Sequence, residues 1–328
     1  MTPVGPSPSD AALETWLGAA DEPSLRFRML SEWKGRPPGD PELDAARREI
    51  GVRGWAREIL DGQLSGGQWT TPGSSGPELY RPKYIATNWR MLVLSELGVT
   101  RAVPGIERAV ELILAAEGGA EGGLGGAGSE VCFTGNCVRM LSRLGYADDP
   151  RLSRGIDWLV ANQKRDGGWH CFPSEVGTID CWEALAAFDA LPAARRGAAV
   201  DRSIVRGVDF YLGHELLGEG APPYEPWLRP HYPIHYYYDF LVGLDTITRL
   251  GFATDPRLGP ALDHLERLRN PEGSWTMGPL HPDTPAVGEV DYRIEPPFYP
   301  FALEWPGAPS RWLTLTARAV LRRAGRSP

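Results

Sequence analysis

Several features that would place the chain in common functional classes are missing from its sequence. Positive charge is not in excess, since 34 Lys and Arg face 42 Asp and Glu and the formal net charge is -8. This balance argues against a basic surface for nucleic acid or anionic lipid. No apolar run reaches the roughly 18 residues of a membrane span, and the first ten residues lack the basic and apolar regions of a signal peptide. We expect a soluble cytoplasmic protein without a nucleic-acid partner or a transmembrane segment.

Cysteines and β-strand patterns are also scarce. The chain has 4 Cys, which in a reducing compartment are free thiols, metal ligands or core residues rather than disulfides. Strict alternation of apolar and polar residues is nearly absent, whereas helical spacing is frequent. We therefore predict an all-α protein. Residues 1–9 are expected to form a disordered tail, followed by helices at 10–17, 23–33 and 42–60.

Glycine and tryptophan recur in turns that divide the rest of the chain into repeats. LGYADDPRL begins at Leu144 and LGFATDPRL at Leu250, and the same interval separates Trp169 from Trp275. The repeat unit is about fifty residues long. It contains an apolar helix, a turn that often carries Asp-Pro, an amphipathic helix and a Gly/Trp turn. The clear repeats extend over about 55–325, with an insertion at 218–231.

The two helices of each unit differ in their surfaces, and this difference predicts the architecture. Helices are predicted at 87–98, 131–145 and 179–191, and the segments 89–98, 137–145 and 240–251 are nearly apolar, as expected of an inner layer. The intervening helices carry one apolar stripe and one charged face, as expected of an outer layer. Repeated helix pairs of this kind can close into a ring. We predict one α/α toroid domain of five to six helix pairs over residues 10–328.

The Gly/Trp turns resemble those of a known superfamily. DWLVANQKRDGGW, with Gln163, Gly168 and Trp169, resembles the QW repeat of squalene-hopene cyclases and related terpenoid cyclases. LDHLERLRNPEGSW and DGQLSGGQW are weaker copies. The same ring of paired helices occurs in protein prenyltransferase β subunits, and the chain is similar to bacterial prenyltransferase/squalene-cyclase repeat proteins. The resemblance implies an isoprenoid-like, apolar small-molecule substrate in the central cavity.

The acidic motifs of the standard cyclases are not present. The Asp-x-Asp-Asp motif of class II terpenoid cyclases and the Asp-Asp-x-x-Asp motif of class I enzymes are both absent. A standard cyclase of either class is therefore not expected. The main hypothesis is an enzyme that performs alkyl transfer or acid-initiated cyclisation on an isoprenoid or another apolar substrate. The alternatives are a non-catalytic toroid that binds a lipid-like ligand or a protein partner, and an α/α-barrel acting on carbohydrate.

Cysteine and histidine gather at one end of the predicted inner helices. Aligned by repeat, Cys132, Cys181 and His235 fall at or just before the start of an inner helix, and Cys171 lies in the loop before one. Sulfur and imidazole suit zinc, and helix N-termini favour the thiolate. We predict a zinc site of Cys132, Cys171 and His235, with Cys181 or Asp180 as the fourth ligand. The competing interpretation is that these cysteines are small buried hydrophobes.

Aromatic residues are expected near the same helix ends. In a prenyl or terpenoid site such rings line an apolar cavity and stabilise carbocations through their faces, whereas in a small toroid they can simply fill the centre. Asp180 and Asp239 are the predicted catalytic carboxylates, and Asp180 also fits a helix cap. The predicted substrate-binding rings are Trp89, Phe133, Trp182, Tyr224, Trp227, Tyr236 and Tyr238.

Overall fold

The computed structural model describes residues 8–70, 79–81, 83–84, 86–116, 123–124, 130–218, 223–279 and 303–327. Within these ranges the chain is mostly helical, so the predicted all-α class is confirmed. The α-helices are α1 (Pro8–Gly18), α2 (Pro23–Arg28), α3 (Pro41–Glu49), α4 (Gly54–Asp61), α5 (Thr87–Glu96), α6 (Ile106–Ala115), α7 (Val131–Leu141), α8 (Arg151–Ala161), α9 (Glu183–Ala190), α10 (Ala198–Gly213), α11 (Phe240–Ile247), α12 (Gly259–Arg267) and α13 (Arg311–Arg323).

Short helical turns and a small sheet complete the described structure. The π-helical segments are η1 (Met29–Trp33), η2 (Ser142–Tyr146) and η5 (Thr248–Phe252), and the 3-10 segments are η3 (Ala193–Arg195), η4 (Glu225–Leu228) and η6 (Pro256–Leu258). Strands β1 (Trp275–Thr276) and β2 (Pro309–Ser310) pair antiparallel, with Trp275 opposite Ser310. The Ser310 hydroxyl then accepts a hydrogen bond from the Leu313 N–H and caps α13.

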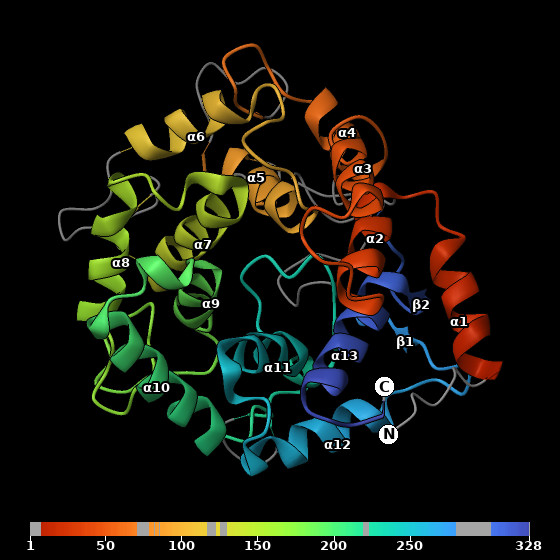
Figure 1. Cartoon of the computed structure of the whole chain (residues 1–328). Helices are drawn as coiled ribbons and strands as arrows, with labels where there is room; N and C mark the ends of the chain where they lie inside the picture. Colours follow the sequence, from red (N-terminus) through yellow and green to blue (C-terminus); the bar gives the residue numbers. More distant parts are fainter. Residues whose placement is uncertain are drawn as a thin grey trace, which may run out of the picture.

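The helices lie in two layers around a common centre. Figure 1 shows α5, α7, α9, α11 and α13 surrounding the centre, with α6, α8, α10 and α12 outside them. Neighbouring inner helices pack directly on one another, from α5 through α7, α9 and α11 to α13. Helix α2 lies between α13 and the pair α3 and α4. The order of the elements in the ring follows their order in the sequence.

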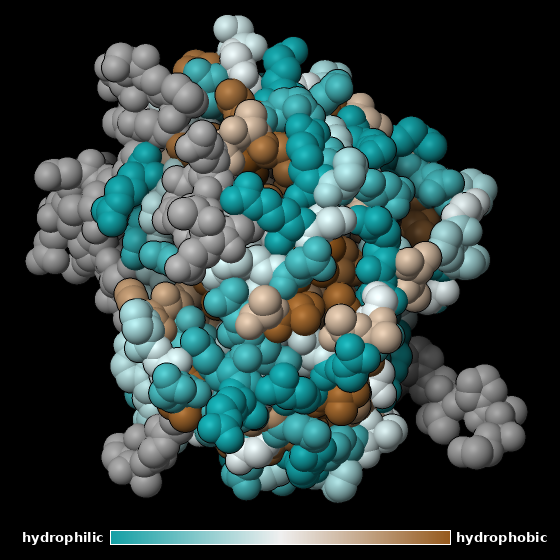
Figure 2. All heavy atoms as spheres, turned by 90° about the vertical axis from the view of Figure 1, so that its left-hand side faces the viewer, coloured by the Kyte–Doolittle hydropathy of each residue, from teal (hydrophilic) through white to brown (hydrophobic). Residues whose placement is uncertain are grey.

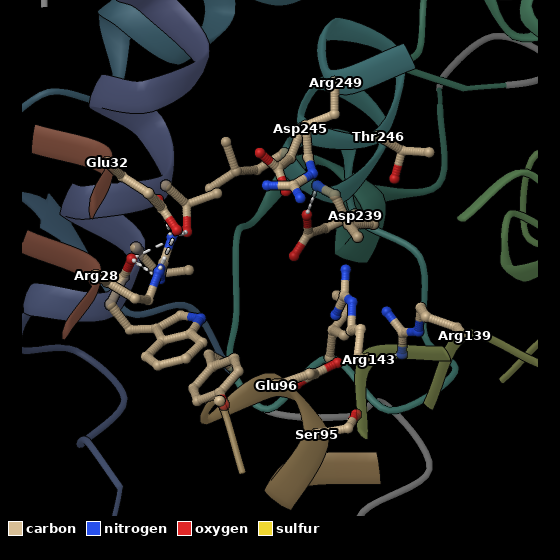
Figure 3. A pocket seen from close by; sticks show the side chains of 18 of the residues that line it. Arg28, Glu32, Ser95, Glu96, Arg139, Arg143, Asp239, Asp245, Thr246 and Arg249 are labelled. Atoms are coloured by element: carbon tan, nitrogen blue, oxygen red, sulfur yellow. Dashed lines mark hydrogen bonds and ion pairs between the residues drawn. The ribbon is translucent and has the colours of Figure 1, made fainter. Parts of the chain in front are cut away.

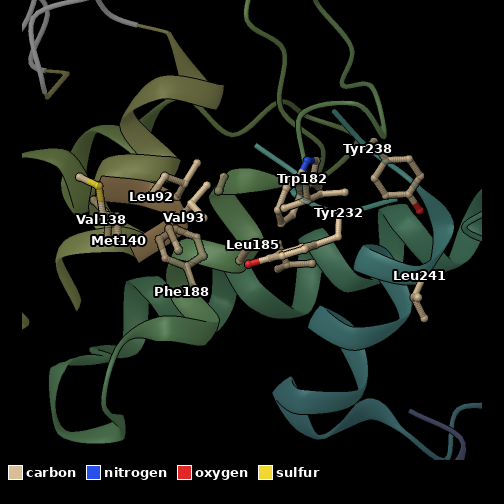
Figure 4. Close-up of a cluster of buried hydrophobic side chains, with 14 of the residues drawn as sticks. Leu92, Val93, Val138, Met140, Trp182, Leu185, Phe188, Tyr232, Tyr238 and Leu241 are labelled. Atoms are coloured by element: carbon tan, nitrogen blue, oxygen red, sulfur yellow. The ribbon is translucent and has the colours of Figure 1, made fainter. Parts of the chain in front are cut away.

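Apolar side chains from the inner helices meet in one continuous core. Leu92 of α5, Met140 of α7 and Phe188 of α9 are almost fully buried and belong to it. Figure 4 shows these side chains converging between their helices, with Leu185 of α9 beside them. Because the inner helices are covered on both sides, they contain few polar residues, as the sequence pattern predicts.

Three tryptophan turns share one hydrogen-bond pattern. Each indole N–H donates to the backbone carbonyl ten residues earlier in the preceding helix. These bonds run from Trp69 to Ile59 at 2.7 Å, from Trp169 to Leu159 at 2.8 Å and from Trp275 to Leu265 at 2.8 Å. All three tryptophans are almost fully buried. The indole of each tryptophan therefore fixes its turn to the helix that precedes the turn.

Two of these turns also carry a glutamine that reaches the next outer helix. The Gln163 side-chain amide donates to the carbonyls of Gly167 at 2.8 Å and Ser203 of α10 at 2.9 Å. Gln63 does the same toward Gly67 and Gly105, the residue that precedes α6. The DGQLSGGQW segment therefore has the same glutamine contacts as the best sequence copy. In both units the amide ties a turn to the following outer helix.

Some predicted helix boundaries are wrong. The single helix predicted at 42–60 is divided into α3 and α4, because Gly54, the first residue of α4, has a left-handed φ of +74° that interrupts a continuous helix. The helix predicted from residue 179 begins only at Glu183, since the Cys181 N–H donates to the Thr178 carbonyl in a turn. The predicted tail at 1–9 falls mostly outside the described residues, and α1 begins at Pro8.

Polar residues dominate the outer face near α6, α8 and α10. Figure 2 shows this side, where apolar groups are small and separated by hydrophilic ones. Surface ion pairs such as Arg151 with Glu111, at 2.8 Å, join neighbouring outer helices. In the described ranges no helix has the length and apolar character needed to cross a membrane.

Candidate functional site

Helix α7 connects the two regions where reactive side chains gather. Cys132 lies in its first turn, Arg139 near its end, and Arg143 in the η2 segment that continues it. Eleven residues separate Cys132 from Arg143, or roughly 16 Å at about 1.5 Å per residue. Helix α9 packs closely on α7, because a Cβ at Gly135 would lie 2.6 Å from the Glu183 backbone carbonyl carbon. Hereafter the two regions are the thiol end and the arginine end of α7.

At the thiol end the structure brings together three of the four predicted zinc ligands. The Cys181 thiol donates to the Cys171 sulfur, and the two Sγ atoms are 3.5 Å apart. The backbone N–H of Cys132 also donates to Cys171 Sγ, at 3.3 Å. The Cys132 thiol lies within hydrogen-bond reach of Cys171 and of the Glu130 carboxylate. Cys171 therefore accepts hydrogen bonds from the Cys181 thiol and from the Cys132 backbone N–H.

These contacts favour the thiolate form of Cys171. Hydrogen bonds from the Cys132 and Cys181 thiols, with backbone N–H groups at the start of α7, lower the pKa of Cys171 to about 3. The same hydrogen bonds and burial raise the pKa of Cys132 and of Cys181 well above the ordinary thiol value.

A buried carboxyl lies beside the same thiols. Glu183, the first residue of α9, is fully buried, and neither of its carboxyl oxygens has a hydrogen-bond partner among the described residues. Burial and the negative charge of Cys171 raise the pKa of Glu183 well above its usual value. Glu183 was not among the predicted site residues. An acidic residue at an otherwise apolar inner position was the available signal in the sequence.

His235 does not join the three cysteines as predicted. Its ring packs against Tyr84, at 5.0 Å between centroids, and against Trp89, at 5.6 Å. Its carbonyl accepts a hydrogen bond from the Asn136 side chain at 3.2 Å. Burial and the nearby His231 lower the pKa of His235 well below its usual value, so the ring is neutral. The repeat alignment placed His235 at or just before the start of an inner helix, and the residue lies in the segment before α11, but its ring packs on aromatic residues.

The four-ligand zinc set is therefore not assembled. Within the described ranges, no group of three or more His, Cys, Asp or Glu is arranged to hold a metal ion. The physical reason is visible at the thiol end, where Cys171 and Cys181 hydrogen-bond to each other instead of pointing at a shared central position. His235, meanwhile, is held by aromatic rings.

Both predicted catalytic carboxylates have protein partners. The Asp180 carboxylate accepts a hydrogen bond from the Trp227 indole at 3.3 Å. Asp239 caps α11 by accepting from the Val242 N–H at 2.9 Å, and it also lies 3.0 Å from Nδ1 of His231. Asp239, and not Asp180, is the helix cap.

Six of the seven predicted aromatic residues form two packed groups, and the seventh, Trp182, lies in the wall of a cavity. Trp89 packs with Tyr80 and Tyr236, and Phe133 contacts Tyr80. The second group runs from Tyr224 through Trp227 to Tyr238. Trp182 alone of the seven lines the cavity described next. The other rings of the prediction pack mainly on one another, as the core-filling interpretation expects.

A cavity of about 320 Å³ lies among the inner helices at the arginine end of α7. Its wall is more polar than the sequence predicts. Figure 3 shows arginine and acidic side chains facing this space from η1, α5, α7 and α11. The charged residues of its wall are Arg28, Glu32, Arg47, Glu96, Arg139, Arg143, Asp239, Asp245 and Arg249. The rings of Trp182, Tyr232 and Trp312 provide apolar surface in the same wall.

Most of these charges are neutralised by neighbours. Arg28 pairs with Glu32 at 2.8 Å, and the buried Arg139 pairs with Glu96 at 3.1 Å. Asp245 pairs with Arg323 of α13, which lies outside the wall. Arg28, Arg139 and Asp245 are therefore each neutralised by a residue of opposite charge within the protein.

Arg143 differs from the paired arginines of the wall. It makes no hydrogen bond or ion pair with any residue in the described ranges, and Figure 3 shows it pointing into the cavity. The Tyr232 hydroxyl, in the same wall, is buried and likewise has no hydrogen-bond partner in the described part of the chain. Sequence reasoning missed this region because it treated 137–145 as nearly apolar. Arg139 and Arg143, one turn apart, were the available signal.

Comparisons with known proteins leave the chain without a family assignment. No protein-family model matches it, and no curated protein matches it. A crystal structure of a protein from Actinoplanes is 18% identical, with a TM-score of 0.46 over 92% of this chain and 89% of that chain. The type II terpene cyclase MstE from Scytonema, with its substrate geranylgeranyl dihydroxybenzoate, is 14% identical, with a TM-score of 0.31 over 81% and 94%. Its apo form has a TM-score of 0.29 at 14% identity over 81% and 95%. Similarities this weak assign no activity.

Proposed function

We propose that the protein is an α/α toroid of the terpenoid cyclase and protein prenyltransferase type that acts as an enzyme on an isoprenoid-like molecule with an anionic head group. The cavity at the arginine end of α7 is the proposed binding site. The sequence resemblance suggests the apolar part of this substrate. The anionic part of the proposal comes from the wall of the cavity.

The observation that carries the proposal is the guanidinium of Arg143 in a largely neutralised cavity. A charged donor that has no partner among the described residues suits an anionic ligand, because Arg binds phosphate and carboxylate oxygens through paired N–H groups. The Tyr232 hydroxyl adds a second donor in the same wall. Tyr232 stacks on Trp312 with 4.2 Å between centroids, which supplies an aromatic surface for an apolar chain.

The size of the cavity favours a short apolar chain. Small-molecule sites commonly measure about 300–1,000 Å³, and the volume of about 320 Å³ is at the lower end. Geranyl diphosphate is therefore a better first probe than geranylgeranyl diphosphate. Geraniol, which has the same chain without the charge, is the matched neutral compound.

Titration calorimetry with geranyl diphosphate and geraniol tests the proposal. We expect the diphosphate to bind more tightly, and Arg143→Met to weaken it by roughly 10–100-fold, since a charge-assisted hydrogen bond contributes about 1.5–3 kcal/mol. Arg48→Met is the control, because Arg48 is exposed on α3 and does not line the cavity. Equal affinities of the wild type and Arg143→Met for the diphosphate would refute the proposed site.

The second candidate function is binding without catalysis. It is favoured by the engagement of both predicted acids, since Asp180 accepts from Trp227 and Asp239 pairs with His231 and caps α11. Mass spectrometry of organic extracts after incubation with prenyl diphosphates separates the two functions. Conversion to a hydrocarbon, alcohol or alkylated product supports an enzyme, and full recovery of a bound, unchanged ligand supports a carrier.

Zinc is not required by this proposal and stays a prediction. Metal analysis of protein purified without a His tag, repeated on Cys132→Ala and Cys171→Ala, is the direct measurement. Stoichiometric zinc that either substitution removes would support it, because thiolates are strong zinc ligands. A metal content unchanged by both substitutions would end the zinc hypothesis.

A further inference from the structure

The three cysteines at the thiol end of α7 form a cluster that the proposed function does not use. None of Cys132, Cys171 and Cys181 lines the cavity at the arginine end. Their contacts are nevertheless specific. Cys171 Sγ accepts from the Cys181 thiol at 3.5 Å and from the Cys132 backbone N–H at 3.3 Å. These contacts hold the sulfur of Cys171 against that of Cys181, with the Cys181 thiol and the Cys132 backbone N–H as its donors.

The backbone holds Cys171 and Cys181 together. Trp169 and Thr178 form an isolated antiparallel bridge, in which the Thr178 N–H donates to the Trp169 carbonyl at 2.9 Å. The Asp166 carboxylate accepts from the N–H groups of Gly168 at 3.1 Å and Gly177 at 2.8 Å, on both sides of the loop. Both cysteines lie within two or three residues of this closure. The backbone of the loop, and not only the side-chain rotamers, therefore brings Cys171 and Cys181 together.

The two thiols also differ in accessibility. Cys171 is partly exposed, in a loop whose neighbouring Phe172 is 69% exposed, whereas Cys181 is buried. A small oxidant therefore reaches Cys171 before Cys181.

From this geometry we propose that Cys171 is an oxidation site and that Cys181 resolves it as an intramolecular disulfide. The oxidant is hydrogen peroxide. The Cys171 thiolate attacks one peroxide oxygen, the O–O bond breaks, and hydroxide leaves, which gives a sulfenic acid. The Cys181 sulfur then attacks the Cys171 sulfur, the S–O bond breaks, and the Cys181 proton leaves with the hydroxyl group as water. Two electrons pass from the two sulfurs to the peroxide.

The step requires only a small movement. The Sγ atoms are 3.5 Å apart, and a disulfide bond is about 2.05 Å long, so they approach by roughly 1.5 Å. Cys132 has a different role. Its backbone N–H donates to Cys171 Sγ at 3.3 Å and so holds that sulfur at the start of α7. The inference concerns the opposite end of α7 from the cavity and does not depend on the proposed function.

Peptide mapping after peroxide treatment tests the proposal on the wild-type protein. Free thiols are alkylated first, and the protein is then digested with trypsin and a glutamyl endopeptidase. Trypsin leaves both cysteines in the segment 166–195, and cleavage after Glu175 separates them. We expect fragments 166–175 and 176–183 to remain joined until reduction. A main linkage from Cys171 to Cys132, or no linkage while Cys171 is overoxidised, would overturn the proposal.

Two substitutions and a chelator sharpen the result. Cys181→Ser should leave Cys171 as a sulfenic acid that dimedone traps, whereas Cys137→Ser should not change the linkage, because Cys137 is buried inside α7 and burial raises its pKa to about 12. Cys171 should react at least about tenfold faster than Cys137. Linkage only after a chelator has removed a bound metal would show that the thiols form a metal site, and would overturn the proposal.

Discussion

Both ends of α7 carry polar side chains on an inner helix, but these side chains find their hydrogen-bond and ion-pair partners in different ways. At the thiol end, Cys132 and Cys181 donate to Cys171, so the cluster provides its own donors and acceptor. At the arginine end, Arg139 is neutralised by Glu96, but Arg143 has no such partner in the described ranges. A cluster whose members hydrogen-bond to one another favours a reaction between those members. A cation beside a cavity, with no ion-pair partner among the described residues, favours the binding of an anionic ligand.

Loss of the buried ion pair should have the largest effect. Arg139 and Glu96 are both almost completely buried, so Arg139→Met leaves an uncompensated carboxylate and should lower the free energy of unfolding by about 3–5 kcal/mol. Denaturant unfolding measures it. The double variant with Glu96→Gln should recover most of the loss.

The exposed ion pair of Arg257 with Asp209 gives the control. Both side chains are solvent-accessible, so Arg257→Met should lower the free energy of unfolding by less than about 1 kcal/mol.

Peroxide oxidation of Cys171 should be unchanged in folded Arg139→Met. A large change there would show that the two ends are coupled through α7, which would break the comparison.

A smaller effect is expected from separating α7 and α9 between the two ends. Gly135→Ala places a Cβ 2.6 Å from the Glu183 carbonyl carbon, and such overpacking should cost about 1–3 kcal/mol. Gly213→Ala is the matched control, since a Cβ there meets nothing within 4 Å. Thermal unfolding of both variants measures the difference. Equal stability of the two would mean that α7 and α9 separate easily.

The smallest effect, counted per pH unit, should be a pH dependence of the unfolding free energy that comes from Glu183. Burial, followed by the charge of Cys171, raises the pKa of Glu183 in the folded protein. Its contribution is therefore fully present below the unfolded pKa, about 4.3, and is lost as pH rises toward the folded pKa. In this window one proton changes the unfolding free energy by up to about 1.4 kcal/mol per pH unit.

Glu183→Gln should remove this dependence, because the amide does not titrate. Denaturant unfolding of both proteins between pH 5 and pH 8, in steps of about one unit, measures the two slopes. Parallel slopes would show that Glu183 is ionised in the folded protein. The thiol end would then hold an ionised carboxylate, as the arginine end does, and the two ends would not differ in this respect.

Local patterns in the sequence predicted the elements better than the site. The Gly/Trp turns were found from spacing alone because the indole hydrogen bond of each turn joins residues ten apart within one unit, as with Trp169 and Leu159. Cys132, Cys171 and Cys181 were grouped correctly, since all three lie at or near the starts of α7 and α9. His235 was misplaced because its position depends on packing against Tyr84, far away in the sequence.

The sequence by itself determined the helical class, the repeated turns and the gathering of cysteines, because helix periodicity and short-range hydrogen bonds depend on nearby residues. Only the tertiary structure decided which polar groups meet across the centre. Arg28 and Asp239 line the same cavity although they lie in α2 and just before α11. The physical reason is that ion pairing and burial depend on distance in space, so the unmatched Arg143 becomes recognisable only once its neighbours have found their partners.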